Sequence, residues 1–214
     1  MDDLALKQAA VQINTLSGWQ EFCMQCRRCS LRRGARGVVF GEGSAQPVIV
    51  FVGEGPGAEE DRLGRPFVGA AGRLFDRIIK AGGWTRAEIY IANVIKCRPP
   101  GNRSPGREEI QSCLPLLQKQ LELLNPRIIV ALGAVAAKTL LDDPSLAITR
   151  ERGRWREIDG RMLMPTFHPA ALLRDPRKKR PVWEDIQQVM ALCEKISREE
   201  GTSLDEEEDS SGGG

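Results

Sequence analysis

The sequence predicts an α/β fold built around a central parallel sheet, and three observations support this prediction. First, residues 46–53, 88–96 and 127–133 are short apolar runs, which is the pattern of strands buried on both faces. Second, segments with helical periodicity lie between these runs, and strands that alternate with helices form parallel sheets. Third, the 214 residues are 41% hydrophobic and 28% charged, which excludes collagen-like, wholly disordered and membrane-embedded classes.

The first third of the chain predicts two helices, one loop and one strand. Residues 3–17 carry apolar side chains at helical spacing. An arginine-rich segment with three cysteines follows at 23–29, and we interpret it as a loop. The run at 46–53 ends in glycine after a β-branched core, as a buried strand does. Residues 69–83 predict a helix that two glycines terminate.

The middle third continues the alternation of strands and helices. The strand at 88–96 is followed by a loop rich in Pro and Gly at 98–106. A helix is predicted over 107–124, where an Asn-Pro pair ends it. The strand at 127–133 and a helix at 134–141 complete this part.

The last third predicts a hairpin, a final helix and a tail. Asp159-Gly160 between two short strands, 154–158 and 161–165, is typical of a type I′ turn. The final helix is expected to run from about 180 to 198. We expect a single domain over residues 1–198 and a disordered, acidic, Gly-ended tail over 199–214.

Charge is distributed unevenly along the chain. The formal net charge is +2, yet residues 199–214 contain seven acidic residues and no Lys or Arg. The rest of the chain therefore has 31 basic and 22 acidic residues, a net charge of +9. A basic body predicts an anionic partner, either nucleic acid or a membrane surface.

No apolar run reaches the roughly 18 residues of a transmembrane helix, and the acidic N-terminus is unlike a secretory signal. We therefore expect an intracellular, cytoplasmic protein whose six cysteines stay reduced. Such cysteines serve metal binding, catalysis or simple burial.

Four cysteines form a candidate metal site. They occur as a C-x2-C pair and a C-x15-C pair, Cys26 with Cys29 and Cys97 with Cys113. Four thiolates from two segments suit tetrahedral zinc or a [4Fe–4S] cluster, and spacing alone does not separate the two. Separately buried thiols are the alternative, but core packing poorly explains C-x2-C in an arginine-rich loop. Cys23 offers a competing pair with Cys26, whereas Cys193 is expected in the core.

Three polar features stand where predicted strands end. A Gly-rich turn, GEGPG at 53–57, carries Glu54 and lacks the Lys-Ser/Thr ending of a P-loop. Asn93 lies within an apolar run, and His168, the single histidine, follows the hairpin and precedes a proline. Ligands of such sheets bind beyond the carboxyl ends of the strands, so we expect these features to converge. Taken singly, each has a structural explanation: a plain turn, a satisfied buried amide and an exposed imidazole.

Two further features are candidates for contact with nucleic acid. Phe67 is either a core residue or a platform on which a base stacks. The stretch RDPRKKR at 174–180 is either a solvated face or a phosphate contact, and its position directly after His168 favours the contact.

Taken together, these motifs resemble the family-4 uracil-DNA glycosylases, the iron–sulfur branch of that superfamily. The matching pieces are the cysteine pair, VVFGEG at 38–43, GEGPG at 53–57, GRPFVG at 64–69, NV at 93–94 with KCRPP at 96–100, and HP at 168–169. Each piece is weak alone, but their order and spacing over residues 26–198 are specific. The resemblance implies a three-layer α/β/α fold with a central, mainly parallel, four-stranded sheet.

The resemblance also implies a cofactor and a substrate. A [4Fe–4S] cluster is expected on the four cysteines named above, with Cys26 chosen over Cys23. The expected partner is uracil-containing DNA, single- or double-stranded, bound by a monomer without any membrane. The expected reaction is hydrolysis of the N-glycosidic bond of a flipped deoxyuridine, which leaves an abasic site. The alternatives are a glycosylase of other deaminated bases and a non-catalytic iron–sulfur or zinc protein that binds nucleic acid.

Roles for individual residues follow from the same resemblance. Phe67 would stack on uracil, Asn93 would read its Watson–Crick edge, and Glu54 would exclude the thymine methyl group. His168 and the turn amides of Gly53, Gly55 and Gly57, with Pro56 shaping the turn, would stabilise the leaving uracil anion. A DNA wedge and phosphate contacts are expected from Leu173, Arg174, Arg177, Lys178 and Lys179.

The sequence does not indicate clearly which residue orients the attacking water. Some superfamily members carry Asp directly after the position of Glu54, where this chain has Gly55. Glu54 and Asp61 are the candidates for that role, and the alternative is that a DNA phosphate offsets the positive charge that develops on the sugar.

Overall fold

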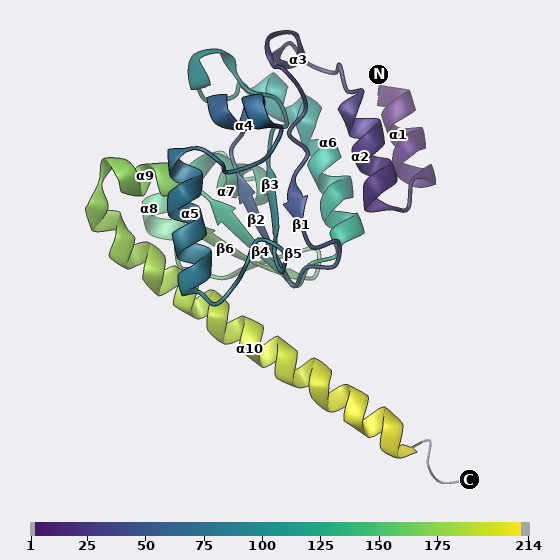
Figure 1. Cartoon of the computed structure of the whole chain (residues 1–214), viewed down its shortest axis with the longest axis vertical. Coiled ribbons are helices and arrows are strands. Elements are labelled where there is room, and N and C mark those ends of the chain that lie inside the picture. The colour runs from purple at the N-terminus through teal and green to yellow at the C-terminus, as the bar shows by residue number, and fades with distance from the viewer. Residues whose placement is uncertain (1–2, 211–214) are drawn as a thin grey trace.

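The computed structural model describes residues 3–210, with side chains described as far as Glu199. It contains a six-stranded sheet of order β1-β3-β2-β4-β6-β5 (Figure 1). The strands are β1 (Glu42–Gly43), β2 (Ile49–Gly53), β3 (Tyr90–Asn93), β4 (Ile128–Leu132), β5 (Arg156–Ile158) and β6 (Arg161–Thr166). The helices are α1 (Asp3–Gln12), α2 (Leu16–Met24), α3 (Leu31–Gly34), α4 (Ala58–Leu63), α5 (Ala70–Ala81), α6 (Arg107–Leu124), α7 (Ala134–Leu140), α8 (Ile148–Glu151), α9 (Pro169–Arg174) and α10 (Lys179–Ser210). Two 3₁₀ turns, η1 (Pro100–Asn102) and η2 (Pro176–Lys178), precede α6 and α10.

The predicted α/β class is confirmed, and the sheet has more strands than the four expected. Strands β3, β2, β4 and β6 form a parallel core, and β1 and β5 pair antiparallel at the two edges. Strand β1 has only two residues, so no sequence pattern could indicate it. The predicted hairpin is β5 and β6, and its second strand also joins β4 in parallel.

The strands are buried on both faces because alternate side chains enter two separate cores. Val50, Val52 and Ile129 pack with α2, α6 and α7 on one face. Phe51 and Val130 pack with α5, α9 and α10 on the other face. Figure 1 accordingly shows α1, α2 and α6 on one side of the sheet and α5 and α9 on the other. This is the expected three-layer α/β/α arrangement.

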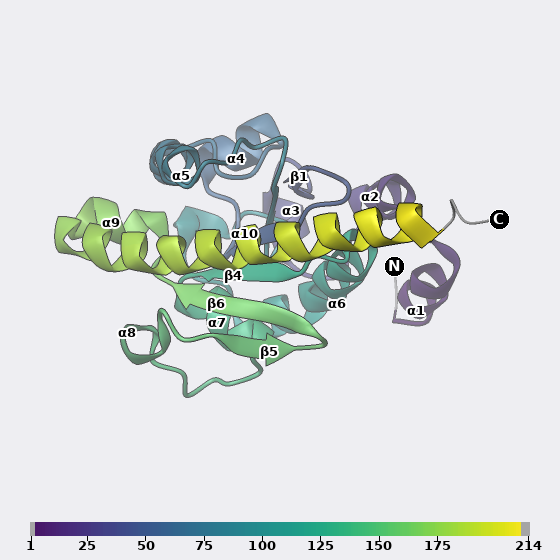
Figure 2. The ribbon, with the colours of Figure 1, turned by 90° about the horizontal axis from the view of Figure 1, so that it is seen from below.

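Both ends of the chain differ from the prediction. The single helix expected over residues 3–17 is two helices, because Thr15 accepts a hydrogen bond from the Gly18 N–H (3.2 Å) and starts α2. Helix α10 continues past the expected end at Arg198 to Ser210 and crosses the molecule from α9 toward α2 when seen from below (Figure 2). The backbone of residues 199–210 is thus helical in place of the disorder expected there. Residues 211–214 and the side chains from 200 onward lie outside the described residues, so disorder of this last part stays a prediction. Within the described part, no helix combines the length and apolarity that crossing a bilayer requires.

Candidate active site

The carboxyl ends of β2, β3 and β6 open into one cleft of about 490 Å³, a volume suited to a small ligand. It brings together eight of the predicted site residues: Glu54, Gly55, Pro56, Gly57, Phe67, Asn93, His168 and Arg174. These residues come from four separate segments of the chain. The strand ends therefore converge in the structure, as the sequence predicted.

Asn93 ends β3, directly beside Gly53 at the end of β2. Its side chain is 2% exposed, and its Oδ1 has no hydrogen-bond partner among the described residues. An unpaired buried amide oxygen is costly, and here a ligand or a water that enters the cleft can complete it. The structural explanation of Asn93 as an amide satisfied by the surrounding backbone therefore fails for this oxygen.

Phe67 places its ring against His168 at the floor of the cleft. The two ring centroids are 5.4 Å apart with an interplanar angle of 29°. On its other side the Phe67 ring contacts Phe75 of α5 at 5.0 Å. Phe67 is thus both a core residue and part of the cleft lining.

His168 is held as a neutral imidazole with a defined tautomer. Its Nδ1 accepts a hydrogen bond from the Ala170 N–H (3.1 Å) at the start of α9, which leaves the proton on Nε2. Burial and, to a smaller extent, the nearby positive charge of Arg174 lower the His168 pKa to about 4. The side chain therefore offers a neutral N–H donor at physiological pH.

The turn after β2 is shaped by close approach of its neighbours. A Cβ on Gly53 would lie 2.5 Å from Asn93 Oδ1 and 2.6 Å from the Phe67 ring, so glycine is required there. A Cβ on Gly55 would meet Ile95 at 2.5 Å. The Gly57 N–H already donates to Glu60 Oε2 (3.1 Å), so this amide is not free for a ligand as the sequence suggested.

Several residues that line the cleft were not predicted as site residues, among them Glu60, Asn102 and Arg103. Glu60 lines the cleft and accepts hydrogen bonds from the N–H groups of Gly57, Val68 and Gly69. Of these three bonds, a sequence pattern indicates only the one from Gly57, because G-x-x-E is a helix-capping pattern. Asn102 and Arg103 also line the cleft, from the Pro- and Gly-rich loop. Asp61, a candidate for the attacking water, does not line the cleft and instead accepts from the Arg36 N–H (2.9 Å).

The predicted DNA-contacting residues lie on α9, on η2 and at the start of α10. Arg174 lines the cleft, whereas Leu173 is 47% exposed beside it and does not. Arg177 and Lys178 both pair with Asp175, at 2.9 and 3.9 Å, and Lys179 is exposed. Of this basic segment, Arg174 is therefore the residue that the structure places in the cleft.

A second cavity, which shares Ile95 with the cleft, is lined by all four predicted metal-binding cysteines. Cys26 and Cys29 follow α2, Cys97 follows β3, and Cys113 lies in α6. Burial raises the thiol pKa of Cys97 to about 12 and that of Cys113 to about 11, and the other cysteines of the set add to both shifts. The cationic side chains of Arg28, Arg32 and Lys96 also line this cavity.

The two remaining cysteines stay outside this cavity. Cys23 is fully buried in α2 and does not line it. Cys193 lies on α10, half-buried against the opposite core, as expected.

Comparison with known proteins identifies the family. Residues 40–187 match the model of the uracil DNA glycosylase superfamily. The chain is 45% identical to a type-4 uracil-DNA glycosylase of Thermotoga maritima, with 80% of this chain and 91% of the relative aligned. Type-4 enzymes of Sulfurisphaera tokodaii (38% identity, 85% and 86% coverage) and Pyrobaculum aerophilum (39%, 78% and 88%) match similarly. The chain therefore belongs to the uracil-DNA glycosylase superfamily and, within it, to the type-4 branch.

Proposed function

We propose that the protein is a uracil-DNA glycosylase that flips deoxyuridine out of DNA and hydrolyses its N-glycosidic bond. The observation that carries the proposal is the buried, unpartnered amide oxygen of Asn93, which lies in one cleft with Phe67 and His168. The relatives named above carry that activity in their names. A cleft of about 490 Å³ accommodates one flipped nucleotide rather than a duplex.

Base recognition is assigned to Phe67 and Asn93. The Phe67 ring stacks on the face of the base. The Asn93 amide accepts from uracil N3–H through Oδ1 and donates to uracil O4 through Nδ2. Cytosine presents an acceptor at N3 and a donor at N4, so both contacts are mismatched and the base is rejected.

We assign His168 the role of stabilising uracil as it leaves as an anion. The Nε2–H of its neutral imidazole donates to uracil O2, where negative charge develops as the bond breaks. The N–H groups of the turn at 53–57, apart from that of Gly57, add to this stabilisation. Such a preformed donor lowers the barrier by about 3 kcal/mol.

We assign two roles to Glu54: it excludes a methyl group at C5 of the base, and it orients the attacking water. Two carboxylates line the cleft, and Glu60 is committed to three backbone N–H groups. Asp61 points to Arg36 instead. Glu54 is thus the remaining side chain that can exclude a C5 methyl group or orient a water.

DNA is held outside the cleft by the basic surface of α9 and η2. Leu173, exposed next to Arg174, is suited to fill the space that the flipped base leaves. Arg177, Lys178 and Lys179 contact phosphates, and the +9 charge of the body adds affinity independent of sequence. We place the enzyme in the cytoplasm, with the DNA, as a monomer with a single domain over residues 1–198.

The second cavity is assigned to a [4Fe–4S] cluster on Cys26, Cys29, Cys97 and Cys113. Four thiolates from two segments suit zinc as well as a cluster. The cluster is chosen because the chain is similar to type-4 enzymes, and the resemblance to the iron–sulfur branch of the superfamily implies it. The surrounding cations Arg28, Arg32 and Lys96 complement its negative charge. Its role is structural, joining the loop after α2 to β3 and α6.

The function is tested with oligonucleotides that carry one uracil, in single-stranded and duplex form, followed by alkaline cleavage at abasic sites. We expect cleavage of both uracil substrates and none of matched strands with cytosine or thymine. A strand with hypoxanthine tests the alternative of broader specificity. Absence of abasic sites from every uracil substrate would overturn the proposal.

The cluster is tested by analysis of the protein purified without oxygen. We expect about four irons and four acid-labile sulfides per chain, and visible absorption that a reductant bleaches. Cys113→Ala is expected to lose both, whereas Cys193→Ala, which removes a cysteine far from the cavity, keeps them. Stoichiometric zinc in place of iron would refute the assignment.

A further inference from the structure

The backbone of Phe67 is in a conformation that an aromatic residue rarely adopts. Its φ is +53°, in the left-handed region where a side chain on Cβ is disfavoured. Such a conformation costs of order 1–3 kcal/mol and persists only where surrounding contacts impose it. Something in the fold therefore holds Phe67 in place.

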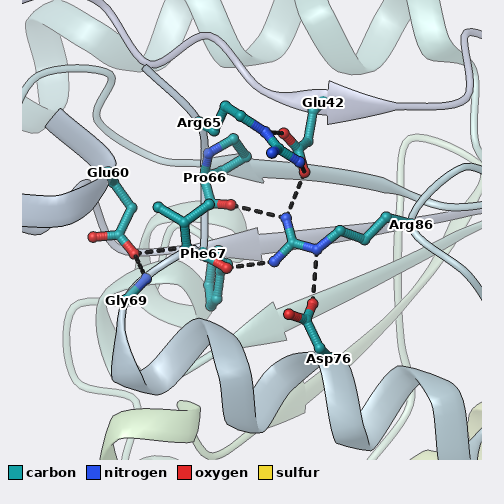
Figure 3. A network of polar contacts seen from close by, with 9 residues as sticks. Glu42, Glu60, Arg65, Pro66, Phe67, Gly69, Asp76 and Arg86 are labelled. Carbon is teal, nitrogen blue, oxygen red and sulfur yellow. Dashed lines mark hydrogen bonds and ion pairs between the residues drawn. The ribbon is translucent and has the colours of Figure 1, made fainter. Parts of the chain in front are cut away.

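Arg86, in the segment between α5 and β3, supplies contacts of the required kind (Figure 3). Its guanidinium donates to the carbonyl oxygen of Pro66 (3.0 Å) and to that of Phe67 itself. Both peptide planes next to the Phe67 Cα are thereby tied to one planar, rigid group. The Arg86 side chain is 22% exposed, so these bonds are largely shielded from water.

The guanidinium is itself fixed by two carboxylates. Its Nε donates to Asp76 of α5 (2.7 Å), and one terminal nitrogen donates to Glu42 of β1. Glu42 also binds Arg65 (2.7 Å). Burial alone would raise the Glu42 pKa, but the hydrogen bonds from Arg65 and Arg86 hold it below its usual value. The sheet edge and α5 thus orient Arg86 from two sides.

The opposite side of the turn is closed by Glu60 and Gly72. Glu60 accepts from the N–H groups of Val68 (2.9 Å) and Gly69 (2.8 Å), which directly follow Phe67. A Cβ at Gly72 would lie 1.9 Å from the Phe67 carbonyl oxygen, so α5 packs tightly against this peptide. Arg86 is the one cation among these contacts that binds the Phe67 carbonyl.

We propose that Arg86 is a positioning residue for base recognition: it holds the backbone of Phe67 in the left-handed conformation that presents the ring to the base. Arg86 does not line the cleft and touches no substrate atom, so it acts through Phe67. This role rests on the proposed function in one respect, namely that the base stacked on the Phe67 ring is uracil.

The catalytic test is a double-mutant cycle under single-turnover conditions. Phe67→Ala removes the stacking surface and is expected to slow uracil excision about 5- to 150-fold. Arg86→Gln is expected to slow it about 10-fold or more, since small displacements of a positioned group have effects of that size. In the Phe67→Ala background, Arg86→Gln is expected to have almost no further effect. Full additivity of the two effects would contradict the proposal.

The structural test needs no activity and exploits the single histidine of the chain. The carbon-bound ring protons of His168 are assigned in NMR spectra without ambiguity and sense the ring current of Phe67 stacked 5.4 Å away. Phe67→Ala supplies the reference without that ring current. In Arg86→Gln the His168 shifts are expected to move toward the reference. Unchanged shifts would overturn the proposal even if excision slowed.

Matched variants separate this role from a general loss of stability. Arg65→Gln removes a guanidinium that binds Glu42 but not Phe67, and is expected to leave the excision rate and the His168 shifts unchanged. If Arg86→Gln does not fold, Asp76→Asn replaces it, because Asp76 is 46% exposed and anchors only Arg86. It is expected to shift the His168 protons in the same direction, to a smaller extent. An inactive wild type with these shifts intact would refute the uracil activity and leave the positioning role standing.

Discussion

Replacing Asn93 by aspartate is expected to slow excision of uracil about 10⁴-fold, because a site built around a buried hydrogen-bond pair discriminates by factors of that size. The new carboxylate is an acceptor only, so it cannot donate to uracil O4 and repels it instead. Its position is 2% exposed, where an unpaired negative charge is strongly disfavoured. Cleavage of single-stranded uracil DNA under single-turnover conditions measures the effect.

The same variant makes a second, qualitative prediction. A carboxylate accepts from the amino group of cytosine, so the preference for uracil over cytosine should shrink. Asn125→Asp is the matched control, since Asn125 caps the end of α6 away from the cleft and its replacement introduces the same charge. Wild-type rates in Asn93→Asp would mean that the amide does not contact the base.

Removal of the His168 imidazole is expected to slow excision about 100- to 1,000-fold, which corresponds to the loss of one donor to a developing anion. His168→Ala should leave the affinity for uracil DNA nearly unchanged, because the interaction forms as the bond breaks. Single-turnover rates and a binding titration separate the two quantities. A variant that loses affinity but keeps its maximal rate would place His168 in substrate binding instead.

The pH dependence distinguishes a neutral donor from a cationic one. Because burial lowers the His168 pKa to about 4, the imidazole stays neutral from pH 8 down to about 5, and its protonation should not change the rate in that range. In the unfolded chain the same group titrates near 6.5, so stability is expected to fall as the pH drops from 6.5 toward 4. NMR titration of the single histidine measures its pKa directly. A folded-state value near 6.5 would contradict the lowered pKa, and an excision rate that rises as the imidazole becomes protonated would rule out the neutral donor.

The elements that the sequence predicted well are those whose pattern is local. Helix α6 was expected at the bounds it has, and the Asn-Pro pair that follows it marks its end. The runs at 46–53 and 127–133 became β2 and β4, since buried parallel strands are apolar throughout. From the order of strands and helices alone, Glu54, Asn93 and His168 were expected at one edge of the sheet, and they are there.

The parts that escaped prediction depend on contacts between distant segments. Arg86 binds carbonyl groups about 20 positions away, and no local pattern marks it. Glu60 acts through backbone N–H groups eight and nine positions later, which any carboxylate could bind. The assignment of Asp61 as a candidate for the water failed for the same reason, because only the fold shows that it points to Arg36.

The order of the strands along the chain also determines which parts of the site are synthesised first. Strand β2 lies between β3 and β4, so the centre of the sheet is complete once residue 132 has been made. His168 follows β6, which joins that sheet last among the parallel strands. In a chain still growing on the ribosome, at about 5–20 residues per second, the residues proposed to recognise the base, Phe67 and Asn93, are therefore made before the donor proposed for the leaving base, His168. The proposed site is complete only when the final third of the chain has been made.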